Sequence, residues 1–172
     1  AGSTLVLTKS GTGTLTLSGV NTYTGATYVQ QGALALTGSA VLGGSAGGGG
    51  ADAKNIVFGL ANSNATLSFE TAAQLGAADQ IRFRNTGGTA GQGGLLNYTG
   101  TTAETVSKTI QCDTSIGIRL GSDSVGGSIK YNGAFSQTNR GIYLEGSGTG
   151  DNELAIAFTG TGGVTKRGAG NW

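Results

Sequence analysis

The sequence predicts an all-β chain that folds as a β-solenoid, a parallel β-helix built from stacked coils. Pairs of apolar residues separated by a single residue recur along the chain, and this spacing places both members of a pair on one face of a short strand. Gly, Asn, Ser and Thr fill the segments between the pairs, and these residues suit tight turns and positive φ. The pattern of side chains is repeated as well as the spacing, which indicates coils that stack like on like. We therefore expect a single β-helix segment over residues 1–172.

The apolar pairs define the strands in order. They are Leu5/Leu7, Leu15/Leu17, Leu34/Leu36, Ile56/Phe58, Leu67/Phe69, Ile81/Phe83, Ile116/Ile118, Ile129/Tyr131, Ile142/Leu144 and Ile156/Phe158. No stretch keeps the i, i+3, i+4, i+7 apolar spacing of an amphipathic helix. Only residues 51–55 and 71–79 suit a helical turn.

The spacing of the strands narrows the architecture. Residues 14–19 return in pattern as residues 33–38, an offset of 19 residues. A β-sandwich also places short strands every 8–12 residues, so spacing alone leaves both folds open. The junctions lack Asn-Gly and Asp-Gly hairpin turns, apart from Asn132-Gly133, and this favours the solenoid. At roughly 20 residues per coil, the chain gives about eight coils and a rod on the order of 40 Å long.

Composition excludes several classes of function. Charged residues make up 11% of the chain and the net charge is +1, so the clustered basic stripe of a nucleic-acid binder is missing. The alternating apolar residues argue against a disordered tail. No run approaches 18 apolar residues, so we expect no membrane insertion by this segment. The chain has no Met and no signal sequence, and we expect it to be a piece of something longer. Its lone cysteine, Cys112, is expected to be a small buried hydrophobe.

Two stretches resemble a known bacterial repeat. Residues 5–36 read LVLTKSGTGTLTLSGVNTYTGATYVQQGALAL, and residues 163–172 read GVTKRGAGNW. The first stretch closely resembles the autotransporter-associated β-strand repeat, also called the passenger-associated transport repeat. The second resembles the start of another copy, in which Lys166 aligns with Lys9 and Trp172 with Leu15.

The resemblance implies a single-stranded right-handed parallel β-helix in a large secreted or surface-exposed bacterial protein. It also implies that the repeat serves export and folding outside the cell and performs no chemistry. The leading hypothesis is therefore a structural segment of an extracellular bacterial fibre, stalk or adhesin, acting as a rigid spacer and located outside the cell or on its surface.

The two copies also suggest a partner. Lys166 follows Lys9 by 157 residues, and we expect the copies to lie in the same phase at either end of the segment. The ends could then stack on another copy of the chain or on adjacent repeats of the same parent chain, a head-to-tail contact that propagates unless it closes. The residues expected at such a contact are Leu5, Leu7, Val164 and Trp172.

Catalysis and cofactor binding are not expected. Asp52, Asp79, Asp113 and Asp151 fall at unequal intervals that do not fit a stacked cluster, and the chain has no His to act as a general base. Glu145, Asp151 and Glu153 flank residues 146–150 and could hold Ca²⁺, but the calcium-binding nonapeptide pattern fails there, and a solvated turn is favoured. The Gly-rich stretch 43–51 lacks a Gly-Lys-Ser/Thr ending, so we expect a protruding loop and no phosphate site.

The alternative function is a polysaccharide-binding surface module of an autotransporter-like passenger. Arg82 and Arg84 alternate with apolar residues, so they share the outward face of one strand and could contact acidic glycans. A solubilising outer face is the simpler interpretation of the two arginines. Aromatic platforms for sugar stacking are a further possibility, and the candidates are Tyr23, Tyr28, Tyr98, Tyr131 and Tyr143.

Overall fold

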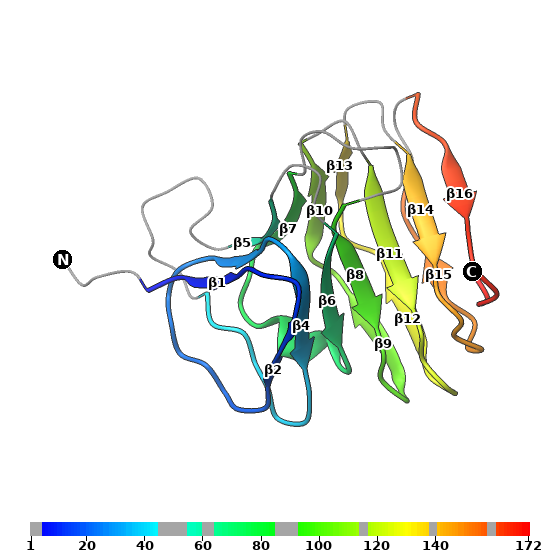
Figure 1. Cartoon of the computed structure of the whole chain (residues 1–172). Helices are drawn as coiled ribbons and strands as arrows, with labels where there is room; N and C mark the ends of the chain where they lie inside the picture. Colours follow the sequence, from blue (N-terminus) through cyan, green and yellow to red (C-terminus); the bar gives the residue numbers. More distant parts are fainter. Residues whose placement is uncertain are drawn as a thin grey trace.

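The chain folds as a stack of short parallel strands, and all observed strand pairings are parallel. A computed structural model describes residues 5–44, 55–59, 64–84, 93–113, 117–137, 141–157 and 161–172. Within them the strands form three sheets that run side by side along the stack, with β1 and β2 at one end and β16 at the other (Figure 1). The prediction of an all-β parallel solenoid is confirmed.

Two long sheets make up most of the fold. The six-stranded sheet contains β1 (Leu7–Lys9), β3 (Thr27–Val29), β5 (Asn55–Phe58), β7 (Gln80–Phe83), β10 (Thr109–Cys112) and β13 (Phe135–Gln137) in that order. The seven-stranded sheet contains β2 (Thr14–Leu17), β4 (Gly32–Leu36), β6 (Ala65–Phe69), β8 (Leu95–Tyr98), β11 (Ile118–Ser122), β14 (Ile142–Glu145) and β16 (Val164–Lys166).

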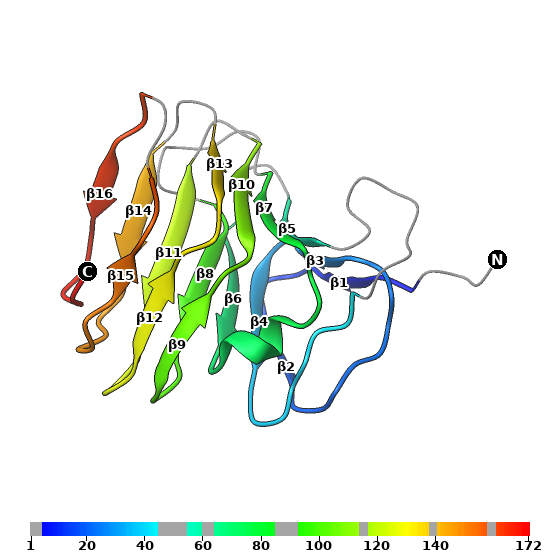
Figure 2. The same ribbon diagram turned by 180° about the vertical axis from the view of Figure 1, so that it is seen from behind.

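A third, shorter sheet lies along the later coils. It is formed by β9 (Ala103–Val106), β12 (Ser128–Tyr131) and β15 (Glu153–Leu154). The described residues contain one helical element, the short 3₁₀ helix η1 (Ala72–Leu75), which contacts β6 and β9 (Figure 2). It falls inside the stretch 71–79 where the sequence allowed a helical turn. No helix in the described residues is long and apolar enough to cross a bilayer.

The core is made of columns of inward side chains. Strand register stacks like residues on like, because each coil pairs with the coil before it and the coil after it. In the seven-stranded sheet one column reads Leu15, Leu34, Leu67, Leu96, Leu120, Leu144 and Lys166. In the six-stranded sheet the column of Val29, Phe58, Phe83 and Cys112 begins with Lys9. Cys112 is buried, as expected of a small hydrophobe in such a column.

The prediction of about eight coils was too high. The two long sheets stack six and seven strands, because most coils are longer than the assumed length of roughly 20 residues. Leu34 follows its column neighbour Leu15 by 19 residues, but Leu67 follows Leu34 by 33 and Leu96 follows Leu67 by 29. The offset between residues 14–19 and 33–38 therefore belongs to the shortest of these coils.

Most of the predicted apolar pairs lie in strands, with informative exceptions. The first strand begins at Leu7, and Leu5 precedes it with 68% of its surface exposed. Ile156 follows β15 without joining it. Ile116, Phe158, Asp52 and residues 45–54, which include most of the predicted loop at 43–51, lie outside the described residues.

Seven strands contain no member of a predicted apolar pair. They are β3, β8, β9, β10, β13, β15 and β16. In β9 only Val106 is buried, and in β10 the partner of Ile110 is a cysteine, so neither strand offers a pair of large aliphatic or aromatic side chains. Leu96 and Tyr98 of β8 are two large apolar residues separated by a single residue, so the pattern that predicted the other strands should also have predicted β8.

The large exposed apolar residues of the described chain gather at the two ends of the stack. Leu5, Val6, Leu15 and Val20 lie at the β1 and β2 end, and Val164 lies on β16 at the other. Val125 is the exception, because it lies in the turn between β11 and β12. The ends of the solenoid thus present apolar surface, while its sides are largely polar.

Candidate functional site

The candidate functional contacts of this chain are polar contacts, most of which join one coil to the next. The first is made by Lys9, a core-column residue that is 6% exposed. Its Nζ donates to the carbonyl oxygens of Ser10 at 2.9 Å, Gly11 at 2.7 Å and Gln31 at 2.9 Å. Gln31 belongs to the following coil, so one buried ammonium closes a turn and links two coils. Three carbonyl acceptors satisfy all three donors of the ammonium, which makes its burial tolerable.

Two further lysines also donate to glycine carbonyls. Lys108 donates from Nζ to Gly76 O at 2.7 Å and to Ala78 O at 2.8 Å, both in the preceding coil. Burial lowers the pKa of Lys108 from its usual value, an effect that the Asp79 carboxylate opposes. Lys166 donates to Gly168 O at 2.9 Å. We call these three contacts the lysine clamps. The capped glycines Gly11, Gly76 and Gly168 all have positive φ, at 76°, 63° and 74°.

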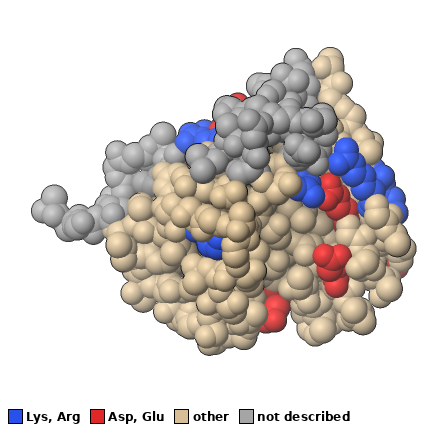
Figure 3. Space-filling view, viewed as in Figure 1, with Lys and Arg blue, Asp and Glu red and all other residues tan. Residues whose placement is uncertain are grey.

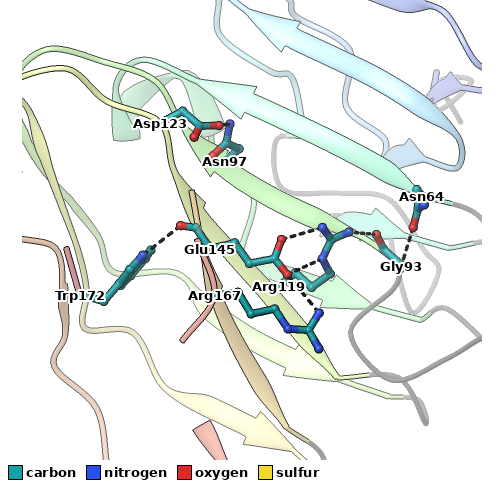
Figure 4. A network of polar contacts seen from close by, with 8 residues as sticks. All are labelled: Asn64, Gly93, Asn97, Arg119, Asp123, Glu145, Arg167 and Trp172. Atoms are coloured by element: carbon teal, nitrogen blue, oxygen red, sulfur yellow. Dashed lines mark hydrogen bonds and ion pairs between the residues drawn. The ribbon is translucent and has the colours of Figure 1, made fainter. Parts of the chain in front are cut away.

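A larger network joins the last coils on the outer face of the seven-stranded sheet (Figure 4). The Glu145 carboxylate accepts from Arg119 Nε at 3.0 Å and Nη2 at 2.7 Å, a two-point contact between β11 and β14. Arg119 Nη1 also donates to Gly93 O at 3.1 Å, and Arg167 Nη1 lies 3.7 Å from Glu145 Oε1. The Arg167 guanidinium covers the Tyr143 ring at 4.1 Å. Basic and acidic groups adjoin near this end of the face shown in Figure 3.

Asn97, Asp123 and Ser147 form a second ladder across three coils. Asp123 Oδ2 accepts from Asn97 Nδ2 at 3.0 Å (Figure 4). Asp123 Oδ1 accepts from both the backbone N–H and the hydroxyl of Ser147 at 2.9 Å. Burial acts to raise the pKa of Asp123, but the hydrogen bonds from Ser147 and Asn97 outweigh it and lower the pKa. A lowered folded-state pKa means that the carboxylate stabilises the fold above its unfolded pKa of about 3.9, and that this stabilisation is lost as pH falls through the folded-state pKa.

This ladder yields a testable prediction on the titration of Asp123. In a carbon-detected NMR titration, the Asp123 carboxyl should titrate below the usual aspartate value. Ser147→Ala removes the hydroxyl donor but keeps the backbone donor, so it should move the midpoint back towards that value without restoring it fully. A wild-type midpoint at or above the usual value would contradict the proposed role of the ladder.

The two arginines suggested as a glycan contact lie on β7 and just after it. Arg82 Nη2 lies 2.6 Å from Asp113 Oδ2, and Arg84 Nε lies 3.2 Å from the same oxygen. Gln111 Nε2 donates to the other Asp113 oxygen at 2.5 Å. Both guanidinium groups thus join adjacent coils, as Arg119 does. Glycan binding by Arg82 and Arg84 stays a prediction.

The residues expected at an end-to-end contact are divided between the two ends. Leu5 and Leu7 lie at the β1 end, and Val164 is 46% exposed on β16. Trp172 packs against the core, 6.3 Å from the Tyr131 ring between centroids, and donates from Nε1 to Glu145 O at 3.0 Å. Trp172 therefore helps to close the last coil. The two copies also begin on different sheets, because β1 lies in the six-stranded sheet and β16 in the seven-stranded one. The expectation that they share one phase is wrong.

The carboxylates considered for calcium each have a protein partner. Glu145 is paired with Arg119, Glu153 with Lys130 at 2.9 Å, and Asp151 Oδ1 accepts from Asn171 Nδ2 at 3.4 Å. In the described ranges no group of three or more His, Cys, Asp or Glu residues could hold a metal ion. Two of the five tyrosines considered for sugar stacking, Tyr98 and Tyr131, are fully buried in the core and cannot offer an exposed ring.

The repeat in the sequence aligned Lys166 with Lys9, but the sequence analysis did not identify Arg119, Asn97 or Lys108 as site residues. The partner of Arg119 could not be recognised in the sequence, because Glu145 lies 26 residues further along the chain. Only the strand register brings them together, with Gly121 of β11 beside Glu145 of β14. The one sequence signal for Arg119 was its position between the apolar residues Ile118 and Leu120, which places its side chain on the outward face of the strand.

Parallel strands, stacked core columns and inter-coil clamps together define a protein of the β-solenoid class. Residues 7–36 match the family model described as passenger-associated-transport-repeat. The repeat and the solenoid together fit an autotransporter-associated repeat β-helix protein, which confirms the resemblance found in the sequence. No significant match was found among curated proteins or among solved structures.

Proposed function

We propose that this chain is a rigid structural segment of an extracellular bacterial fibre, stalk or adhesin, and that it associates end to end. The observation that carries the proposal is the unbroken stacking of the core column from Leu15 to Leu144 across the seven-stranded sheet. In a continuous ladder of this kind the position of each coil is fixed by the coils on either side of it.

The inter-coil contacts support the same role. Clamps such as Lys9 to Gln31 and Arg119 to Glu145 cross between coils and resist their separation. The repeat at residues 7–36 belongs to a family typical of secreted passengers, which supports a location outside the cell or on its surface. Many charged side chains of the described residues, such as Arg82, Arg119 and Lys130, pair with carboxylates of the next coil, and this favours a structural role over catalysis.

Rigidity can be measured by the distance between spin labels on Thr14 and Thr165, which are exposed on β2 and β16 at opposite ends of one sheet. Pulsed electron resonance on a Cys112→Ala background, diluted with unlabelled protein, should give one narrow peak near 30 Å, from about six inter-strand spacings of ~4.8 Å. The same sample in urea is the control and should give a broad distribution. A broad distribution in buffer would show a flexible connector and contradict the rigid-spacer proposal.

A further inference from the structure

Asn132 and Gly133 form the one Asn-Gly pair of the sequence, and the fold does not use it as a hairpin turn. The pair joins β12 to β13, which lie in different sheets. A type I′ hairpin turn needs positive φ at both central residues, and Gly133 does not have it. The glycine therefore meets a different requirement.

Close packing of consecutive coils is that requirement. A Cβ at Gly133 would lie 2.6 Å from the carbonyl carbon of Lys108 and closer still to its oxygen, and both are backbone atoms of the preceding coil. Asn132 is held on the same coil, because its N–H donates to Val106 O at 3.2 Å. Stacking thus demands a glycine at position 133, and Asn132 is followed by a backbone nitrogen that no side chain shields.

The reactive groups of this pair are accessible. Asn132 is exposed to solvent. Among the described residues, neither its side-chain amide nor the Gly133 N–H has a hydrogen-bond partner. A pocket of about 340 Å³ opens beside the corner and is lined in part by both residues, so water reaches the bond between them.

Other asparagines of the described chain hold the same amide in place. Asn21 Nδ2 donates to Gly19 O and to Val41 O, both at 2.9 Å, and Asn97 Nδ2 donates to Asp123 Oδ2 at 3.0 Å. Both asparagines are also followed by a residue that carries a side chain. Loss of ammonia from either amide would first have to break these hydrogen bonds.

We propose that Asn132 is a site of spontaneous deamidation, at which the folded chain modifies itself. Gly133 N gives its proton to water and attacks Asn132 Cγ. The new C–N bond closes a succinimide ring, the Cγ–Nδ2 bond breaks, and ammonia leaves with a proton from the solvent. Water then opens the ring at either carbonyl and leaves aspartate or isoaspartate at position 132. The net reaction consumes water and releases ammonia, so a neutral corner becomes anionic, and isoaspartate also lengthens the backbone by one carbon.

Incubation of the folded protein in mildly alkaline water enriched in ¹⁸O tests the proposal, because ring opening places one solvent oxygen in the product. Trypsin digestion in ordinary water then releases the fragment of residues 131–140, in which mass spectrometry locates the label. Labelled product should form at position 132 about tenfold faster than at Asn21, or more, because ring closure at Asn21 must break two side-chain hydrogen bonds.

Asn132→Gln is the test variant, because its longer side chain has to close a larger and less favourable ring, and it should lose the labelled product. Asn21→Gln is the matched control and should leave labelling at position 132 unchanged. Labelling of position 132 in urea but not in the folded protein would show that the fold protects this corner and would overturn the proposal. Product without the label would have formed during digestion, and equal labelling of the fragment in Asn132→Gln would place the reaction elsewhere; either result also overturns it.

Discussion

Phe83→Ala should lower the free energy of unfolding by about 3–5 kcal/mol, the usual cost of deleting a buried phenylalanine ring. Phe83 is 1% exposed and stacks on Phe58 of the preceding coil, with ring centroids 4.8 Å apart. Its column continues to Cys112 in the next coil, so the cavity would open between two neighbours that cannot move together without breaking the ladder. Urea denaturation followed by circular dichroism measures the change.

Val125→Ala is the matched control for this experiment. Val125 is 80% exposed, so its truncation should change the free energy of unfolding by no more than about 0.5 kcal/mol. A loss below about 1 kcal/mol for Phe83→Ala would mean that the aromatic column is not the core of the fold.

Gly32→Ala should destabilise the chain by about 3 kcal/mol or more, because it combines two penalties. Gly32 has φ +69°, a conformation that L side chains rarely adopt. A Cβ there would also lie 2.4 Å from Gly11 O and 2.5 Å from Gly13 O, which are backbone atoms of the preceding coil. The new methyl group would therefore push apart the two coils that Lys9 links. Urea denaturation again provides the measurement.

Gly11→Ala separates the two penalties. Gly11 has φ +76°, but a Cβ there would meet nothing within 4 Å. Its cost should be the backbone term alone, about 1 kcal/mol. Equal losses for Gly11→Ala and Gly32→Ala would show that close approach of coils at Gly32 contributes nothing to stability.

The class of fold could be predicted from the sequence because apolar core residues alternate with outward residues along each short strand. Leu15/Leu17 and Leu34/Leu36 each place two leucines on one face, and the register pairs them directly. The number of coils was not predictable in the same way. The length of a coil depends on the connections between its strands. The sequences of these connections show no apolar periodicity from which their length could be predicted. The strand β9 illustrates a second limit, since a strand with one buried residue leaves no alternation to detect.

The inter-coil contacts were only partly predictable. The likeness of the Lys9 and Lys166 turns was visible in the sequence, because the capped glycine follows each lysine by two residues. The third acceptor of Lys9, Gln31 O, was not, since it is set by how the next coil stacks. Arg119 and Glu145 meet for the same reason. Such pairs depend on register across whole coils, and the length of a coil is the quantity that the sequence leaves open.

The connections between the six-stranded and the seven-stranded sheet differ widely in length. Two residues separate β3 from β4, whereas eleven separate β7 from β8. All four strands nevertheless stack in register on the neighbouring strands of their own sheets. Residues added at this corner therefore leave the axial rise unchanged. The length of the molecule along its axis depends on the number of coils and not on the number of amino acids. Two proteins of this kind with equal numbers of residues can therefore differ in axial length. Conversely, a gene can gain or lose residues at this corner while the distance that its product bridges stays constant.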